Sequence, residues 1–363
     1  MATADVEIPK TYKGAIYDKP GELSTQVKEL DMPEPGPGQV LINLTHSGVC
    51  HSDFGVMMSS WAGLPFPTQA GQVGGHEGVG KIVKMGSGTE RSPVKVGDRV
   101  GIKWVASVCD ACPACLAGHD GVCFNQQVSG YYFPGTFQQY ALGPASYVTP
   151  IPEGLDSAAA APLLCAGVTV YSALRKSNTR SGNWVVVLGA GGGLGHLAVQ
   201  FASRCMGLRV IGIDADAKKD IAEESGAEHF IGLSEKEVSK KVMELTGGLG
   251  AHAVLCVSAA NAAYAGSVDM LRFGGTLVCV GIPEGKPVPI ASALPQFLIA
   301  KELKIVGVAV GNRKEAIETL EFAARGLVKV HYRVEKLDKL TDVFKEMESG
   351  QLKGRVVLDL SAS

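Results

Sequence analysis

The sequence predicts an α/β protein with two domains, a mostly β domain and an inserted doubly wound domain with a parallel sheet. The chain has 363 residues and 46 % apolar content, which exceeds the usual single-domain size and is enough for two cores. From about Trp184 onward, short β-branched runs alternate with segments of helical length. Residues 1–160 are instead rich in glycine, proline and short alternating apolar runs, which is typical of β structure.

The same patterns predict the individual elements. Alternating apolar residues in the β domain indicate strands at 39–45, 79–83 and 99–103. The inserted domain is expected to contain strands at 184–188, 209–214, 253–257, 276–280 and 304–310, and helices at 194–205, 217–225, 235–245 and 261–272. The remaining segment predicts helices at 316–325 and 340–349 and a strand at 355–360. We therefore expect domains at 1–165 and 166–311, with 312–363 returning to the first.

Charge and hydropathy exclude several classes of protein. The formal net charge is −2, and lysine and arginine are scattered, so no basic stripe could neutralise a nucleic-acid backbone. The N-terminal residues contain two acids and no apolar signal core, and no stretch reaches about 18 uninterrupted apolar residues. We expect a cytoplasmic protein without membrane or nucleic-acid partners.

Four cysteines lie close together in the first domain. Cys109, Cys112, Cys115 and Cys123 have the spacing C-x2-C-x2-C-x7-C within a lobe at about 104–125. In a reducing compartment such a cluster is better explained by metal binding than by disulfides, and four thiolates can complete a tetrahedral zinc shell. Because such a shell has no open position, we assign it a structural role; the alternative is four incidental cysteines in a loop.

A second set of possible metal ligands is dispersed in the sequence. It comprises Cys50 with His51, Ser52 and Asp53, then His76 with Glu77, and then Cys165. A catalytic zinc has three protein ligands and one open position for water or substrate. The alternative for Cys165 is a buried apolar cysteine on a helix.

A glycine-rich turn indicates a dinucleotide site. Gly189, Gly192, Gly193, Leu194 and Gly195 directly follow an apolar strand and open a helix, where the backbone can approach a pyrophosphate. Asp214 ends the next strand, where a carboxylate can bind the ribose hydroxyls and would repel a 2′-phosphate. NAD is therefore expected rather than NADP, unless Asp214 is only a turn residue or helix cap.

These motifs together resemble a known family. GVCHSD, GGHEGVG, the four-cysteine lobe, LLCAGVTVY and GAGGGLG are similar in order and spacing to those of the zinc-containing medium-chain alcohol dehydrogenases, especially the yeast and fungal ethanol-type branch. The resemblance covers essentially the whole chain. It implies a GroES-like catalytic domain with a Rossmann domain, and reversible oxidation of a primary or secondary alcohol.

The resemblance also implies roles for single residues in the catalytic domain. Cys50, His76 and Cys165 would bind the catalytic zinc, with Glu77 as a transient ligand and Asp53 hydrogen-bonded to the ligand histidine. Zinc in this set acts as a Lewis acid that lowers the pKa of the alcohol. Ser52 would begin a proton relay whose usual terminal histidine is replaced by Gly55, so water or His51 must complete it.

Cofactor and substrate contacts are implied in the same way. Lys219 would border the adenosine, and His51 and Arg355 the pyrophosphate. The resemblance places Thr169, Val280 and Val310 at the nicotinamide, and Trp61, Trp104 and Ala309 in the substrate pocket. Ala309 replaces a larger aromatic residue of the yeast relatives, so longer alcohols should fit.

Related enzyme classes and a non-catalytic function fit the sequence less well. Polyol dehydrogenases usually replace the third cysteine ligand with a carboxylate, and cinnamyl-type enzymes generally prefer NADP, so Cys165 and Asp214 argue against both. A non-catalytic scaffold would not require the complete ligand set with Ser52. We expect two zinc ions and one NAD site per subunit, a small alcohol or aldehyde as the substrate, and a homotetramer as in the yeast type.

Overall fold

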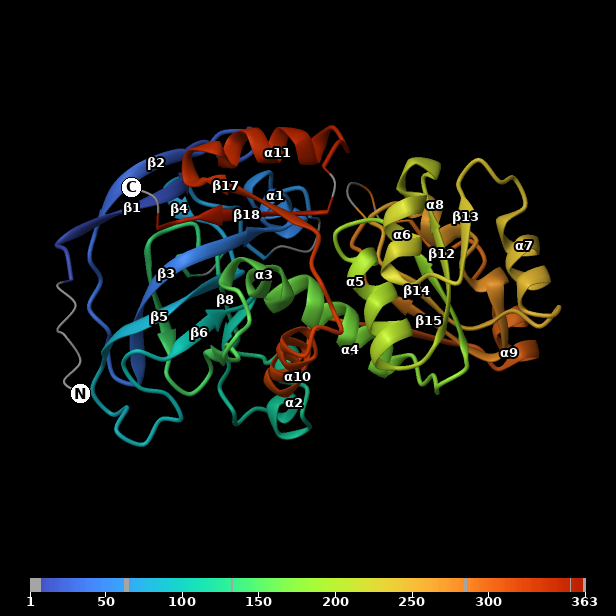
Figure 1. Cartoon of the computed structure of the whole chain (residues 1–363), viewed down its shortest axis with the longest axis horizontal. Coiled ribbons are helices and arrows are strands. Elements are labelled where there is room, and N and C mark those ends of the chain that lie inside the picture. Colours follow the sequence, from blue (N-terminus) through green and yellow to red (C-terminus); the bar gives the residue numbers. More distant parts are fainter. Residues whose placement is uncertain are drawn as a thin grey trace. The chain divides into compact units, whose positions relative to one another are not determined.

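The chain folds into two compact units, shown in the computed structural model of Figure 1. The structure describes residues 8–61, 65–131, 133–283, 286, 288–352 and 354–361. The first unit comprises the chain up to Cys165 together with Asn312–Leu320 and the segment from Tyr332 onward. The second comprises Ala166–Gly311 and Glu321–His331.

The first unit is built mainly from β structure. Its largest sheet has seven strands in the order β10-β6-β5-β3-β18-β17, with β9 also pairing with β3. The strands are β3 (Gln39–Val49), β5 (Gly78–Met85), β6 (Arg99–Ile102), β9 (Tyr140–Pro144), β10 (Thr149–Pro150), β17 (Tyr332–Lys336) and β18 (Arg355–Asp359). A three-stranded sheet is formed by β1 (Thr11–Tyr17), β2 (Gln26–Asp31) and β4 (Gln72–Val73), and a two-stranded one by β7 (Val105–Ser107) and β8 (Gln127–Val128).

Helices close the core of this unit. Phe344 of α11 (Leu340–Glu348) is fully buried, and its ring packs against Phe54 and Phe137 at centroid distances of 6.2 and 6.4 Å. Phe54 lies on α1 (His51–Met57), so the C-terminal helix supports the helix that carries possible metal ligands. The other helical segments are α2 (Pro113–Leu116), η1 (Asp120–Val122), α3 (Ser157–Pro162) and η6 (Leu337–Lys339). Two further segments belong partly to each unit, the π-helical turn η2 (Leu163–Gly167) and α10 (Arg313–Ala324).

The second unit is a parallel six-stranded sheet with the order β13-β12-β11-β14-β15-β16. Strand order reverses between β11 and β14, as in doubly wound folds that bind dinucleotides. Its strands are β11 (Trp184–Leu188), β12 (Arg209–Asp214), β13 (His229–Gly232), β14 (Ala251–Cys256), β15 (Leu271–Cys279) and β16 (Lys304–Gly307). Its helical segments are α4 (Val168–Lys176), α5 (Gly195–Gln200), η3 (Phe201–Cys205), η4 (Asp216–Lys218), α6 (Lys219–Ser225), α7 (Val238–Leu245), α8 (Asn261–Ala265), η5 (Val268–Met270) and α9 (Pro295–Lys301).

Several elements differ from those predicted. β13, β17 and α9 were not expected, and the helix predicted at 261–272 ends after Ala265, because Gly266 caps it and β15 begins at Leu271. The strand predicted at 304–310 ends at Gly307, and Val310 has a φ of 51°, which no strand accommodates. The two units themselves have the predicted fold classes.

The segment Glu321–His331 belongs to the second unit, although the sequence predicted that all of 312–363 returns to the first. Phe322 packs its ring against Tyr171 and Phe201 at 5.6 and 6.1 Å. The backbone of Lys329 exchanges two hydrogen bonds of 2.8 Å with the buried amide of Gln200. These contacts bind the segment to the second unit before the chain returns at Tyr332.

One helical run in the described chain, Ser157–Lys176, is long and apolar enough to cross a membrane by length and composition. Its most apolar window is 83 % buried inside the protein, as is usual for core helices. The run therefore provides only weak support for a membrane span.

The start of α3 provides a test of this fold. The side chain of Asp156 accepts hydrogen bonds from the backbone N–H of Ala159 at 3.0 Å and from the hydroxyl of Tyr332 at 3.1 Å. Replacing it by alanine leaves the first helical turn uncapped, so Asp156→Ala should lower the free energy of unfolding by about 1 kcal/mol in urea titration. Asp156→Asn keeps a side-chain acceptor and should lose much less; an equal loss would contradict the capping role.

The same variant should show a defined pH dependence. Burial raises the pKa of Asp156, but the hydrogen bonds from Ala159 and Tyr332 outweigh it, so its pKa in the folded protein is lowered. A carboxylate of this kind stabilises the protein above its unfolded pKa of about 3.9 and loses that contribution as the pH falls. The difference in the free energy of unfolding between wild type and Asp156→Ala should be largest at neutral pH and should shrink below about pH 4.

Candidate metal and cofactor sites

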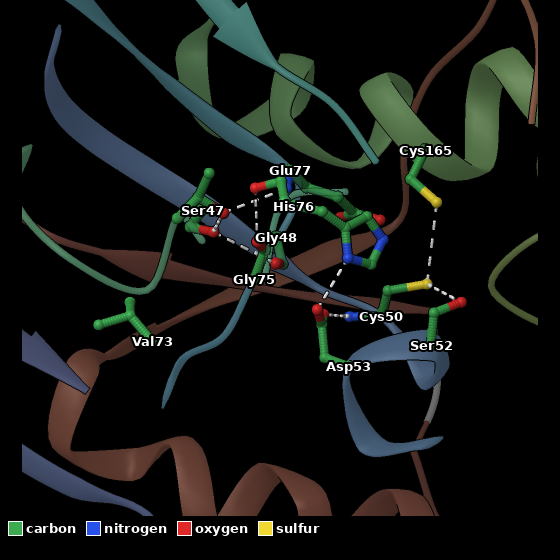
Figure 2. Close-up of polar contacts among 12 residues, drawn as sticks. Ser47, Gly48, Cys50, Ser52, Asp53, Val73, Gly75, His76, Glu77 and Cys165 are labelled. Atoms are coloured by element: carbon green, nitrogen blue, oxygen red, sulfur yellow. Dashed lines mark hydrogen bonds and ion pairs between the residues drawn. The ribbon is translucent and has the colours of Figure 1, made fainter. Parts of the chain in front are cut away.

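A buried hydrogen-bond chain organises the first candidate metal site (Figure 2). The Nδ1 atom of His76 lies 2.8 Å from Oδ1 of Asp53, and both side chains are at most 2 % exposed. The other carboxylate oxygen of Asp53 accepts a hydrogen bond of 2.9 Å from the backbone N–H of Cys50. Asp53 on α1 therefore orients the histidine before β5 and the cysteine after β3 at the same time.

Four possible metal ligands lie close together beside these hydrogen bonds. One ligand atom each from Cys50, His76, Glu77 and Cys165 lies within 4.8 Å of the others, and the two sulfur atoms are 4.0 Å apart. Cys165 lies on the π-helical turn Leu163–Gly167, a distortion that frequently marks functional sites. The Nε2 atom of His76 is buried and has no hydrogen-bond partner in the described part of the chain. Two sulfurs and such an imidazole nitrogen fit zinc.

The charges around this cluster are compensated by a buried arginine. Arg355 of β18 forms an ion pair with Glu77, and both side chains are almost fully buried. Burial raises the pKa of Glu77 to about 7, although the nearby Arg355 cation acts in the opposite direction. The hydrogen bond from Cys165 holds the pKa of Cys50 well below its usual range, and Arg355 contributes in the same direction. The hydrogen bond with Cys50 and burial raise the pKa of Cys165 well above its usual range, so a divalent cation would be needed to hold both sulfurs as thiolates beside Glu77.

The four-cysteine lobe forms a second compact cluster. The ligand atoms of Cys109, Cys112, Cys115 and Cys123 all lie within 4.8 Å of one another. The Sγ atom of Cys123 is 3.5 Å from that of Cys109 and accepts hydrogen bonds from the backbone N–H groups of Cys109 and Asn125. A hydrogen bond from the Asn125 side chain, together with backbone N–H groups, lowers the pKa of Cys109 to about 6. This set fits a closed tetrahedral zinc shell.

The glycine-rich turn of the second unit follows β11 directly. A Cβ atom on Gly195, the first residue of α5, would come within 1.8 Å of the carbonyl oxygen of Gly189, so only glycine fits there. Asp214 at the end of β12 accepts hydrogen bonds of 2.8 Å from the backbone N–H groups of Gly191 and Ala215. Gly192, Gly193 and Leu194 complete the turn. The carboxylate is thereby fixed beside the backbone expected to hold a pyrophosphate.

The other predicted cofactor residues are placed as follows. Lys219 is 56 % exposed with its amine 3.7 Å from Glu223, whereas the amine of Lys218 lies 3.9 Å from Asp214. Sequence reasoning missed Lys218, although its spacing of four residues from Asp214 was a signal. Thr169 is buried on α4, Val280 directly follows β15, and Val310 has the strained φ of 51°. His51 and Arg355 lie in the first unit, and Thr169, Lys219, Val280, Ala309 and Val310 in the second.

Two tryptophans lie beside the first metal site. The ring centroids of Trp61 and Trp104 are 6.1 Å apart, and Trp104 contacts His76 edge-on at 4.9 Å. A Cβ atom at Gly55 would lie 2.7 Å from Nε1 of Trp61, so the indole occupies the space of a side chain there. Ser52 has its hydroxyl 3.7 Å from the sulfur of Cys50. The structure thus brings Trp61, Trp104 and Ser52 near the metal ligands, and explains why residue 55 carries no side chain.

Comparison with protein families finds two matches. Residues 36–153 match the alcohol dehydrogenase GroES-like domain, and residues 193–325 match the zinc-binding dehydrogenases. The first region contains Cys50, His76 and the four-cysteine lobe, and the second begins within the glycine-rich turn and contains Asp214.

Individual relatives match along nearly the whole chain. Alcohol dehydrogenase 2 of Emericella nidulans is 62 % identical over 98 % of this chain and 99 % of its own length. The alcohol dehydrogenase of Schizosaccharomyces pombe is 40 % identical over 98 % of this chain and 99 % of its own length. Among solved structures, the acetophenone reductase of Geotrichum candidum in complex with NAD superposes with a TM-score of 0.85, at 26 % identity, over 99 % of this chain and 100 % of that one.

The hydrogen bond between Asp53 and His76 provides a test of the first metal site. Asp53→Asn removes the carboxylate charge while keeping a similar shape, so zinc affinity at this site should fall about tenfold to hundredfold. Competition with a chromogenic chelator should then release one of two zinc ions earlier than in wild type. Asp98→Asn, at a carboxylate that instead binds the backbone of Lys95, is the matched control. Identical release curves for all three proteins would refute the role of Asp53.

Proposed function

This chain belongs to the zinc-containing medium-chain alcohol dehydrogenases of the fungal type, and we propose that Cys50, His76 and Cys165 form the site at which its alcohol substrate reacts. It is an NAD-linked enzyme that oxidises an alcohol reversibly to an aldehyde or ketone. The observation that carries the proposed site is the buried set of two sulfurs and one unpartnered imidazole nitrogen. Such a set leaves one zinc position open to substrate.

The residues of the first unit have distinct roles in this proposal. Zinc, when bound, supplies a Lewis acid that lowers the pKa of the alcohol, and NAD accepts the hydride. Asp53 keeps the His76 proton on Nδ1, so that Nε2 faces the metal. The ion pair with Arg355 holds Glu77 beside the cluster, where its carboxylate would be available as a transient ligand. This pair supports a role of Arg355 at the metal more directly than its expected role at the pyrophosphate.

The proton of the alcohol leaves through Ser52 in this mechanism. Its hydroxyl lies beside Cys50 and can accept the proton as the alcohol ionises. Residue 55 is a glycine, and Trp61 fills the space that a side chain would occupy there. This position therefore supplies no acceptor for the proton. His51 is the adjoining half-buried imidazole, and it or a water molecule passes the proton to solvent.

The second unit supplies the cofactor site. Asp214 binds the hydroxyls of the adenosine ribose, and the turn from Gly189 to Gly195 holds the pyrophosphate. Lys219 and the nearer Lys218 border the adenosine, while Thr169, Val280 and Val310 contact the nicotinamide. The positive φ of Val310 costs energy for a β-branched residue, which is typical of functional positions.

The substrate pocket is assigned to Trp61, Trp104 and Ala309. The two indoles lie at the metal site and favour small or flat alcohols, because they narrow the space around it. Ala309 provides room for substrates longer than ethanol.

We also propose a cytoplasmic homotetramer. The proposal is supported by large apolar side chains that are exposed in the single chain, among them Phe273, Ile299 and Ile305 of the second unit and Leu116 with Phe124 on the four-cysteine lobe. Exposed apolar side chains of this size are typical of subunit contacts.

The two zinc sites should differ in what their loss changes. Cys165→Ala should abolish NADH production from ethanol, because it removes a ligand of the reactive site, while the protein remains folded. Cys112→Ala should mainly lower the thermal midpoint, because closed zinc sites contribute folding energy. Each variant should contain one zinc per subunit by metal analysis. Full activity of Cys165→Ala would overturn the ligand assignment.

Cofactor choice should depend on Asp214. Asp214→Gly removes a charged hydrogen bond to the ribose and relieves repulsion of a 2′-phosphate, so the NAD/NADP ratio of kcat/KM should fall by at least about tenfold. Asp216→Asn is the matched control, because that carboxylate binds Ser234 at the next turn. An unchanged ratio in Asp214→Gly, or the same change in the control, would show that Asp214 is an ordinary turn residue.

A further inference from the structure

A buried tyrosine links the ends of two central strands in the second unit. Tyr264 of α8 is 7 % exposed, and its hydroxyl donates a hydrogen bond of 2.6 Å to the carbonyl oxygen of Gly281. The same hydroxyl accepts a bond of 3.2 Å from the N–H of Val280 and lies 3.4 Å from the carbonyl oxygen of Cys256. One side chain therefore contacts both residues after β15 and the last residue of β14.

The turn at Val280 and Gly281 is also held by the backbone of β14. Both N–H groups donate to the carbonyl oxygen of Cys256, at 3.1 and 2.9 Å. A Cβ atom on Gly281 would come within 2.2 Å of the carbonyl oxygen of Ser258, so the turn lies directly against the chain after β14. The Tyr264 hydroxyl holds the turn through its side-chain bonds, and the position of Val280 is fixed by both sets of contacts.

This turn lies at the edge of the sheet where the cofactor binds. In a doubly wound sheet the dinucleotide lies across the carboxyl ends of the strands, with one nucleotide on each side of the reversal in strand order. Asp214 and the glycine-rich turn belong to the β11 and β12 side, so the ends of β14 and β15 belong to the nicotinamide side.

We propose that Tyr264 is a positioning residue for the nicotinamide end of the cofactor, acting through the backbone of Val280 and Gly281. The inference rests on the proposed function, which places Val280 at the nicotinamide. Burial raises the pKa of Tyr264 well above its ordinary value, so the hydroxyl remains a donor at every working pH. A phenylalanine would fill the same space and lack only the two hydrogen bonds.

The test compares two ligands in the intact zinc-loaded enzyme. NADH contains the nicotinamide, whereas ADP-ribose has the same adenosine and pyrophosphate without it. Tyr264→Phe should raise the Kd of NADH about tenfold, as expected for two lost neutral hydrogen bonds, and leave the Kd of ADP-ribose within about twofold. The primary deuterium isotope effect on kcat should rise, because a less fixed nicotinamide slows hydride transfer.

Thr246→Val is the matched control. The hydroxyl of Thr246 is buried in the same unit. It donates a hydrogen bond of 2.7 Å to the carbonyl oxygen of Val242 and accepts one of 2.9 Å from the N–H of Gly250. It lies before β14, at the opposite end of that strand from Tyr264. This variant should lose stability and leave the Kd of both ligands unchanged.

A second variant moves the same turn while keeping the tyrosine. Gly281→Ala pushes the turn away from Ser258, so it should also raise the Kd of NADH and leave the Kd of ADP-ribose unchanged. This variant provides the test if Tyr264→Phe does not fold. Equal weakening of NADH and ADP-ribose, or a selective loss in Thr246→Val, would overturn the role of Tyr264. Wild-type protein that binds ADP-ribose but not NADH would refute the proposed function itself, and with it this inference.

Discussion

The need to compensate buried negative charge constrains the whole catalytic unit. The sulfur atoms of Cys50 and Cys165 and the carboxyl group of Glu77 are buried at one point, and in ionised form an uncompensated cluster of these groups would be strongly destabilising. Arg355 supplies one positive charge through its ion pair with Glu77, and a divalent cation bound at the proposed site would supply the rest. The requirement ties three parts of the unit together, because Asp53 lies on α1, Glu77 directly precedes β5 and Arg355 begins β18.

Asp53 couples this electrostatic requirement to geometry. Its two oxygen atoms bind the imidazole of His76 and the backbone of Cys50, so one carboxylate orients two proposed ligands that are separated in sequence. A further hydrogen bond of 3.2 Å runs from the buried hydroxyl of Tyr17 to the backbone carbonyl of Asp53. The second unit uses backbone contacts instead, since Asp214 and Tyr264 bind the N–H and carbonyl groups of turns at the sheet edge.

The sequence predicted those parts of the structure that depend on local patterns. β11 and β12 have the predicted bounds because their apolar β-branched runs are continuous, and the four-cysteine lobe was evident from its spacing. β17 was missed because it is partly exposed and alternates with charged residues, and β13 because it has only four residues of mixed polarity. The pair of Glu77 and Arg355 joins residues 278 positions apart, and the hydroxyl of Tyr264 binds backbone groups, so neither leaves a local signal.

The order of these residues along the chain has a consequence for biosynthesis. All seven proposed metal ligands are translated by Cys165, before any residue of the nucleotide-binding unit has left the ribosome. Arg355 is on β18, which can pair with β3 only after all of the second unit has been translated. Metal uptake by the nascent chain can therefore precede folding of the second unit, whereas the charge balance around the proposed reactive site is completed only when β18 is inserted.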